Sequence, residues 1–262
     1  MSIQTMEETL FPVKEVPAIF MKTEDKKKSL QVGTGYKFIV REDTGDVLSC
    51  MTDQYQIVDN KTVVDKTKKV LKGSGAILKE ARTFGGGSKS IWTWTFPKTE
   101  VEIRKGDFVH PELIIKNSYD GSTSVDIMGG AFRLVCLNGL TIGNVVSRKK
   151  NVHKIYNQGI NNIDWAIEQT LKNLNQIFDE EFPTFAKTKL HTRKHIADTI
   201  KMIPSQYLEE FTRYLTNNKI DTYWDLLNAA THLATHTANR DRESTHIMES
   251  KIYPSIKRWA RA

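Results

Sequence analysis

The sequence predicts an α+β fold, in which an antiparallel β-meander with one inserted helix is followed by a helical C-terminal third. Three observations predict this fold. Short apolar runs separated by Gly, Asn and Asp turns fill residues 36–142, helical periodicity begins at residue 160, and one lysine-rich amphipathic segment interrupts the strands at residues 61–72. The chain has 262 residues, which is enough for one large domain or two small ones with a buried core.

The first predicted strands form hairpins. Residues 36–40 and 47–51 flank an Asp/Thr/Gly turn, and residues 76–84 and 90–96 flank a Gly-rich loop. Between the hairpins, the valines and Leu71 of residues 61–72 are spaced as on one helix face, and Gly73 ends this helix. In the second hairpin Trp92, Trp94 and Phe96 alternate with smaller residues, so all three rings point to one face.

The remaining elements follow the same periodicities. Strands are predicted at residues 101–104, 113–116, 123–128 and 131–137, and helices at residues 160–178, 207–215, 221–238 and 252–259. This order predicts three regions. Residues 1–30 form an N-terminal arm, residues 31–145 a β-rich core domain, and residues 146–262 a helical C-terminal region.

Several classes of protein are excluded by composition. No apolar window is long enough for a transmembrane helix, and the first residues lack the charge pattern of a secretory signal. Two cysteines, Cys50 and Cys136, are too few for a disulfide framework or a cysteine zinc site. We therefore expect reduced, mostly buried thiols in a protein located in the cytoplasm of its host cell, with no membrane partner.

The net charge of +7 is concentrated in the middle of the chain. Residues 1–60 hold 7 basic and 10 acidic residues, residues 61–160 hold 17 and 8, and residues 161–262 hold 14 and 13, so the net charges are −3, +9 and +1. Clustered Lys and Arg attract a phosphate backbone because binding releases condensed counterions. The central segment is thus the candidate surface for nucleic acid.

Nine basic residues of this segment are predicted to contact nucleic acid. They are Arg82, Lys89, Arg104, Lys105, Lys116, Arg133, Arg148, Lys149 and Lys150. Arg133 interrupts an apolar run, so it either reaches a ligand or pairs with a carboxylate such as Asp120 or Asp126. Trp92 and Trp94 are possible stacking platforms for bases, although rings on one face of a hairpin more often form the core.

Catalytic and metal-binding patterns are incomplete. His191 and His195, like His232 and His236, are four residues apart, and His246 follows, but a hydrolytic zinc site needs a third ligand and a general base. Phosphate-binding loops of nucleotide hydrolases and Gly-x-Ser-x-Gly elbows are absent from the sequence. We expect no catalytic residue, metal or cofactor, and a metal-dependent nuclease is the weakest hypothesis.

Three segments carry a resemblance. They are Tyr55-Gln56-Ile57-Val58, then Asn117-Ser118-Tyr119-Asp120-Gly121-Ser122 with Phe132-Arg133-Leu134-Val135-Cys136-Leu137-Asn138-Gly139-Leu140, and Trp224-Asp225-Leu226-Leu227-Asn228-Ala229-Ala230-Thr231-His232. This pattern resembles a family of phage- and plasmid-borne proteins classed as a domain of unknown function, which implies a mobile-element origin. The order of elements is also similar to that of phage single-strand annealing proteins of the Redβ and RecT class, a resemblance of architecture alone.

Two principal hypotheses follow. In the first, the protein is a non-catalytic phage or plasmid protein that binds single-stranded DNA, with RNA as the other possible strand, forms a homo-oligomer, and assists annealing or recombination. In the second, it is an anti-defence module that binds a host protein or an anionic nucleotide, with Arg133, Asn117 and Asp120 around the ligand.

Overall fold

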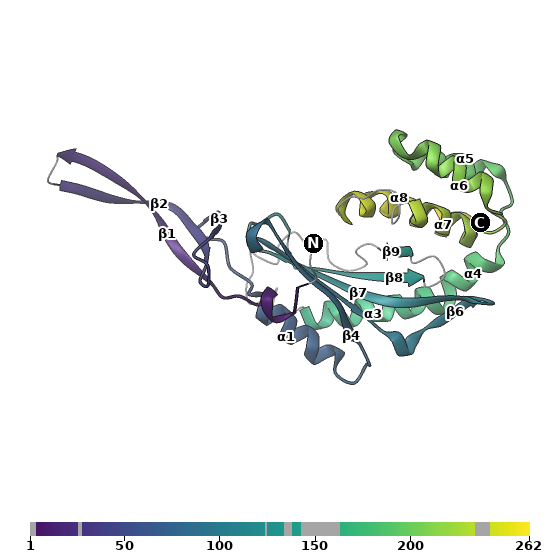
Figure 1. Ribbon diagram of the computed structural model, residues 1–262, viewed down its shortest axis with the longest axis horizontal. Coiled ribbons are helices and arrows are strands. Elements are labelled where there is room, and N and C mark those ends of the chain that lie inside the picture. Colours follow the sequence, from purple (N-terminus) through teal and green to yellow (C-terminus); the bar gives the residue numbers. More distant parts are fainter. Residues whose placement is uncertain (1–3, 26–27, 124, 134–137, 143–162, 234–241) are drawn as a thin grey trace. The chain divides into compact units, whose positions relative to one another are not determined.

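The structure is a computed structural model, and it confirms the α+β fold (Figure 1). It describes residues 4–25, 28–123, 125–133, 138–142, 163–233 and 242–262. The chain divides into two units, each of which is described separately. Unit 1 comprises Met1–Trp94, Ile114–Ile127 and Val146–Glu168, and unit 2 comprises Thr95–Leu113, Met128–Val145 and Gln169–Ala262. Unit 2 combines parts of the strands with the helices, and the division into an arm, a β-rich core domain and a helical region stays a prediction.

The strands form two sheets. Their bounds are β1 Val13–Asp25, β2 Lys28–Arg41, β3 Val47–Thr52, β4 Ile77–Phe84, β5 Lys89–Thr95, β6 Val101–Arg104, β7 Asp107–Ser118, β8 Asp126–Arg133 and β9 Asn138–Ile142. The first sheet has the order β1-β2-β3. The second has the order β4-β5-β7-β8-β9, with β6 paired to β7. The strand pairs β1-β2, β2-β3, β6-β7 and β8-β9 are antiparallel, as the predicted meander requires.

One helix lies between the two sheets in sequence, and the others follow the strands. They are α1 Asn60–Leu71, α3 Ile163–Gln176, α4 Phe182–Lys187, α5 Arg193–Met202, α6 Leu208–Asn217, α7 Tyr223–His232 and α8 Arg242–Ala260. A π-helical turn, η4 Ile177–Glu181, joins α3 to α4. Short 3-10 turns occur at η1 Glu7–Thr9, η2 Gly85–Gly87, η3 Pro97–Thr99 and η5 Ser205–Tyr207. Among the described helices, none combines the length and apolar character needed to cross a membrane.

The N-terminal region contains a long hairpin where the sequence predicts an arm. β1 pairs with β2 from Val13 opposite Arg41 to Asp25 opposite Lys28. β3 pairs with β2 only from Tyr36 to Val40, so the pairing of Ile19 with Gly33 lies in a two-stranded portion (Figure 1). Charged residues interrupt the apolar alternation of residues 13–25. Backbone pairing across the hairpin, rather than local periodicity, therefore defines this strand.

The two faces of the β1-β2-β3 sheet differ in burial. Ile39 is fully buried and packs with Phe11, Tyr55 and Tyr119. Its neighbour Phe38 points to the other face, because successive strand residues alternate. Phe38 pairs with Cys50 of β3, which is exposed. The expectation of a buried thiol is thus wrong for Cys50, while Cys136 lies outside the described residues.

A buried polar network holds the start of α1 in unit 1. The Asn60 amide nitrogen Nδ2 donates to the Thr9 carbonyl at 2.8 Å and to Ser90 Oγ at 2.9 Å. Asn117 Nδ2 donates to Asn60 Oδ1 at 2.9 Å, and the Asn60 backbone N–H donates to the Tyr119 hydroxyl at 2.9 Å. The side chain of the N-cap residue Asp59 makes no capping hydrogen bond. A side chain of the N-cap residue ordinarily accepts a hydrogen bond from a backbone N–H of the first helical turn. Here the buried network anchors that turn instead.

Unit 2 has a core of aromatic and aliphatic side chains. Phe178 of the π turn and Phe182 and Phe185 of α4 are all nearly fully buried, and Phe182 packs against Trp224 of α7 with ring centroids 4.9 Å apart. Leu174 of α3 packs over Gly129 of β8, where a Cβ atom would lie 2.7 Å from Leu174 Cδ2. The helix therefore approaches the strand closely because this position lacks a side chain.

A buried carboxylate also lies in unit 2, at the end of the π turn. The Glu181 side chain is 3% exposed and accepts hydrogen bonds from the Tyr253 hydroxyl and from Arg261, the latter at 3.2 Å. Lys257 Nζ is 2.5 Å from the same carboxylate. Burial and the hydrogen bond to Glu181 raise the pKa of Tyr253. Lys257, Arg261 and the Tyr253 hydroxyl therefore stabilise the negative charge of the buried Glu181 carboxylate.

The Asn60 network predicts a large effect of one substitution. Asn60→Ala should lower the free energy of unfolding by about 2–4 kcal/mol, because it leaves Thr9, Ser90 and Asn117 with buried unpaired polar groups. Urea unfolding followed by circular dichroism measures this change. Asn218→Ala is the control, since its exposed amide donates only to the Tyr214 carbonyl at 2.9 Å, and it should cost about 1 kcal/mol or less. Equal losses in both variants would contradict the role of the network.

Candidate nucleic-acid interface

The predicted stacking platform of β5 lies in the core. Trp92 is fully buried and Trp94 is 6% exposed. Trp92 Nε1 donates to Thr9 Oγ1 at 2.9 Å, which ties β5 to the N-terminal segment within unit 1. A base cannot reach the face of a ring that is covered by protein, so the structure excludes both rings as stacking residues. The alternation of the strand was predicted correctly, and its aromatic face is the core face.

Two of the predicted basic residues of unit 1 pair with carboxylates in that unit. Arg82 on β4 forms an ion pair with Glu80. Lys89 begins β5 with its Nζ 3.9 Å from an Asp120 carboxylate oxygen. Lys116 on β7 is half-buried and also engaged in an interaction. Arg82 and Lys89 therefore carry less free positive charge than the sequence suggests.

Arg104 of unit 2 has a structural role. Its Nε atom donates to the Asp107 carboxylate at 3.2 Å, and its Nη1 atom donates to Asp225 at 2.6 Å. Trp224 Nε1 donates to the same Asp107 oxygen at 2.8 Å. Asp225 in turn closes the capping box at the start of α7 with Thr222. Arg104 thus joins β6 to the start of α7, whereas its neighbour Lys105 is exposed in the β6–β7 turn.

The remaining predicted residues cannot be placed as a group. Arg133 ends β8, and its side chain lies outside the described residues, as do Arg148, Lys149 and Lys150. The predicted set is also divided between the two units, with Arg82, Lys89 and Lys116 in unit 1 and Arg104, Lys105 and Arg133 in unit 2. A single groove built from all nine residues stays a prediction.

Asn117 and Asp120, two residues of the alternative anion pocket, make hydrogen bonds and ion pairs within unit 1. Asn117 is 1% exposed, and its amide donates to the Val58 carbonyl at 2.8 Å and to Asn60. Burial alone would raise the pKa of Asp120, but hydrogen bonds from Ser122 and the nearby Lys89 ammonium lower it below the usual range. Asp120 therefore remains a carboxylate that shapes the turn, and an anion pocket formed by Asn117 and Asp120 together with Arg133 stays a prediction.

Lysines on α1 form a basic surface that the predicted residue set omitted. Lys61, Asp65, Lys68 and Lys72 recur at helical spacing and are exposed, opposite the buried Val63, Val64, Thr67 and Leu71. Asp65 pairs with Lys61 at 2.5 Å. Lys68 and Lys72, with the adjacent exposed Lys69, have no carboxylate partner among the described residues. Helical periodicity was the available signal, because a buried face implies an opposite exposed one.

An exposed aromatic pair was missed for a different reason. Tyr36 and Phe38 of β2 are 49% and 37% exposed. They are two residues apart, so their rings share one face of the strand, with Val16 of β1 opposite Phe38. Lys14 pairs with Val40 and lies on the same face. The sequence shows the alternation of β2, but it does not show which face the core covers.

Two histidines of unit 2, His195 and His232, pack against aromatic rings. His195 Nδ1 lies 2.7 Å from the Tyr223 hydroxyl, and its imidazole stacks on Trp259 with ring centroids 4.5 Å apart. The His232 ring packs on Tyr214. No cluster of three potential metal ligands occurs in the described parts of the chain. His236 lies outside the described residues, as does the side chain of His246.

The contacts of Arg104 predict an effect on stability rather than on binding. Arg104→Gln should lower the free energy of unfolding by about 1–3 kcal/mol, because it leaves the buried Asp107 carboxylate with one partner fewer. Thermal and urea unfolding measure this loss. Lys105→Gln removes the same charge from an exposed side chain, so it should change stability by less than about 0.5 kcal/mol. An Arg104→Gln protein of normal stability would refute the structural role.

The chain is similar to a known protein family over most of its length. A protein-family model described as Domain of unknown function (DUF932) matches residues 47–252. The matched region includes β3 to β9, α1, and the helices up to most of α8. No solved structure matches the chain significantly. The family match covers well over half of the sequence, and the chain therefore belongs to the DUF932 family, whose function is unknown.

Proposed function

We propose that the protein binds single-stranded nucleic acid without catalysing a reaction, and that it assists annealing or recombination for a phage or plasmid. Homo-oligomerisation and a cytoplasmic location in the host cell are part of the same proposal, through the resemblance to annealing proteins. The observation that carries the proposal is the exposed positive surface of α1. It lies in the central segment, which holds the excess of basic residues.

The α1 surface keeps its charge because few acidic side chains neutralise it. Asp65 pairs with Lys61, so the surplus lies with Lys68, Lys69 and Lys72 at the C-terminal end of the helix. Cations at a helix C-terminus also interact favourably with the helix dipole, by about 0.3–1 kcal/mol each. That interaction leaves the ammonium groups in solvent, where phosphate oxygens can approach them. Several cations on one exposed face favour a polyanion over a single small anion.

The preference for single strands is supported by Tyr36 and Phe38, which replace the buried tryptophans as candidate stacking residues. Stacking of a base on an aromatic side chain contributes about 1–3 kcal/mol and tolerates any base. In a duplex the base faces are already stacked on each other, so exposed rings discriminate in favour of single strands. Lys14 on the same face adds a cation for the backbone.

Oligonucleotide binding tests the proposal. A labelled single strand of roughly 20 nucleotides exceeds the site sizes of many single-strand binding folds. It should bind tightly at about 50 mM salt and far more weakly at about 200 mM. The triple variant Lys68→Gln, Lys69→Gln, Lys72→Gln should bind more weakly, with a salt slope lower by about 2, or about 0.7 for each phosphate contact. Fluorescence anisotropy measures both quantities.

The matched control removes three exposed cations from unit 2, through Lys201→Gln, Arg213→Gln and Lys251→Gln. This variant loses the same net charge, so it separates a specific surface from overall electrostatic attraction. No binding by the unmodified protein at about 50 mM salt would refute the proposed function. Equal weakening in both triple variants would refute the role of α1.

The aromatic pair gives a separate prediction. Tyr36→Ala with Phe38→Ala should weaken binding of the single strand by about 1–3 kcal/mol per ring and leave binding of the matching duplex unchanged. Val47→Ala removes another exposed apolar side chain from the same sheet and should have no effect. Competition between labelled single strand and unlabelled duplex measures the discrimination. Unchanged discrimination in the double variant would show that the rings do not stack on bases.

A further inference from the structure

The connection between α4 and α5 in unit 2 is strongly basic. Residues 187–195 read Lys-Thr-Lys-Leu-His-Thr-Arg-Lys-His, with four cations, two histidines and no acidic residue. Lys187, Lys189, His191, Arg193 and Lys194 are all exposed. The net charge of residues 161–262 is only +1. Averaging over that region therefore conceals the strongest local cluster of the helices.

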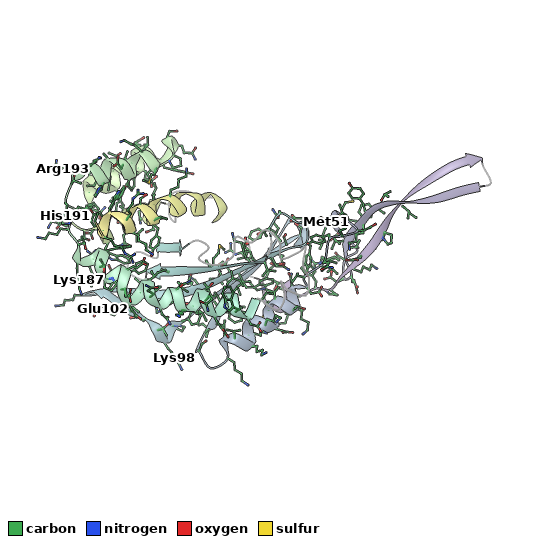
Figure 2. The ribbon with its side chains drawn as sticks, turned by 180° about the vertical axis from the view of Figure 1, so that it is seen from behind. Met51, Lys98, Glu102, Lys187, His191 and Arg193 are labelled. Carbon is green, nitrogen blue, oxygen red and sulfur yellow. The ribbon has the colours of Figure 1, made fainter. Side chains whose placement is uncertain are left out.

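Three cations of this segment have charges that no carboxylate neutralises in the part of the chain that the structure describes. Some exposed cations elsewhere in unit 2 pair with carboxylates, such as Lys201 with Asp198 at 3.0 Å and Arg213 with Glu209 at 2.8 Å. Lys187, Lys189 and Arg193 have no carboxylate partner within the described parts of the chain. Figure 2 shows Lys187, His191 and Arg193 along one outer side of the helices. Like charges gathered without counter-ions repel one another, and a bound polyanion relieves that repulsion.

The backbone of the segment is held in place. The Leu190 N–H donates to the Asp221 carbonyl at 2.8 Å, and the Tyr223 N–H donates to the Thr188 carbonyl at 3.3 Å. Thr192 caps α5 by accepting a hydrogen bond from the Lys194 N–H at 3.1 Å. The backbone that carries the cations is therefore ordered before binding, so less backbone conformational entropy is lost when a ligand binds.

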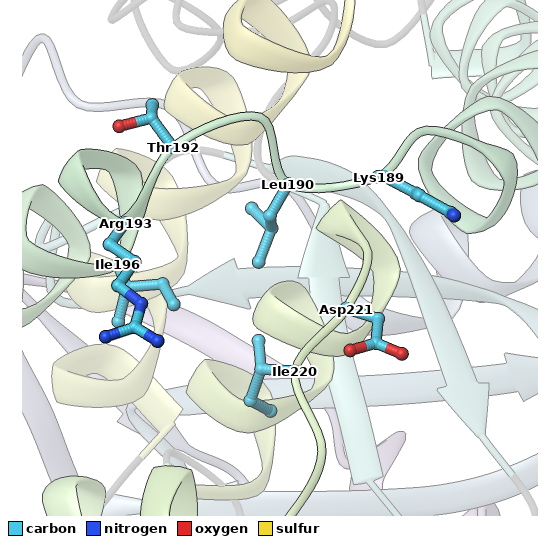
Figure 3. Close-up of a pocket in the computed structure, with 7 residues that line it drawn as sticks. All are labelled: Lys189, Leu190, Thr192, Arg193, Ile196, Ile220 and Asp221. Carbon is cyan, nitrogen blue, oxygen red and sulfur yellow. The ribbon is translucent and has the colours of Figure 1, made fainter.

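The segment also borders a pocket of about 360 Å³, lined by Lys189, Leu190, Thr192, Arg193, Ile196, Ile220 and Asp221. Lys189 and Arg193 lie on either side of Leu190, so two cations border an apolar floor formed with Ile196 and Ile220 (Figure 3). Asp221 also lines the pocket, but Lys219 neutralises its carboxylate at 2.5 Å. This combination suits a nucleotide of a strand, whose phosphates meet the cations and whose base or sugar covers the apolar floor.

We infer that residues 187–194 form a second contact surface for the single-stranded nucleic acid, in unit 2, with Lys189 and Arg193 holding phosphates at the pocket. This inference rests on the proposed function and adds a surface that is separate from α1 in sequence. A strand that contacts both surfaces should show a steeper salt dependence than one that contacts either surface alone.

The test is a double variant of the full chain, Lys189→Gln with Arg193→Gln, compared with Lys201→Gln with Arg213→Gln. Anisotropy with the same labelled strand should show at least about tenfold weaker binding for the first variant and a salt slope lower by about 1.4, since each phosphate contact contributes about 0.7. The control variant loses the same charge and should bind nearly as well as the unmodified protein. Thermal melting of both variants verifies that they are folded.

Each outcome distinguishes this inference from the proposed function. If the unmodified protein binds the strand, the α1 triple variant weakens it, and the Lys189/Arg193 variant behaves like its control, the second surface is refuted and the proposed function stands. If the unmodified protein binds no strand, both fail. Inorganic phosphate or a mononucleotide is the remaining probe. If either stabilises the protein against heat while no strand binds, the pocket is a small-anion site and the inferred polymer contact is refuted.

Discussion

The hydrogen bond between the buried amides of Asn60 and Asn117 is the constraint on which unit 1 depends. It joins the start of α1 to β7. The Asn60 side chain also donates to the Thr9 carbonyl, and the Asn117 side chain also donates to the Val58 carbonyl. The Asn60 amide also reaches Ser90 on β5, beside Trp92. Buried amides allow few alternative geometries, because each polar group that loses its partner costs the full free energy of its desolvation. The exposed lysine face of α1 is oriented by the same bonds that anchor its first turn.

Most of the fold could be predicted from local patterns. The first hairpins, α1 and the helical character of the C-terminal part were evident from alternation, helical spacing and turn residues. The bounds of β3, β4, β5, α1, α3 and α6 lie within a few residues of the predicted ones. β2 and α8 begin eight and ten residues earlier than predicted, and α4 and α5 were not predicted. β1 could not be predicted in this way, because Lys14, Glu15 and Pro17 interrupt its apolar pattern. Its strand is defined by pairing with β2, a long-range interaction that periodicity does not report.

The candidate site was less predictable, for physical reasons that particular residues illustrate. Local sequence shows that Trp92 and Trp94 share a face, but which face is covered depends on Thr9 and the segments that pack there. It shows that Arg104 is a cation, but not that Asp107 and Asp225 converge on it. Charge summed over about a hundred residues describes composition, whereas a ligand responds to charges within about one Debye length, ~8–10 Å. The run at residues 187–194 is visible only at that shorter scale.

The π turn at Ile177–Glu181 has a consequence for how this fold tolerates change in length. A π turn contains one more residue than the corresponding α-helical turn, and such turns are often found at functional positions. Each residue of an α-helix advances the side chains by about 100° around the axis. Deleting one residue within the π turn would leave an ordinary α-helical turn and keep Phe182 and Phe185 facing the core that buries them, whereas deleting one residue from α4 ahead of Phe185 would rotate that ring away from the core. The π turn is thus the place between Leu174 and Phe182 where this chain can lose one residue without repacking the side chains around α4.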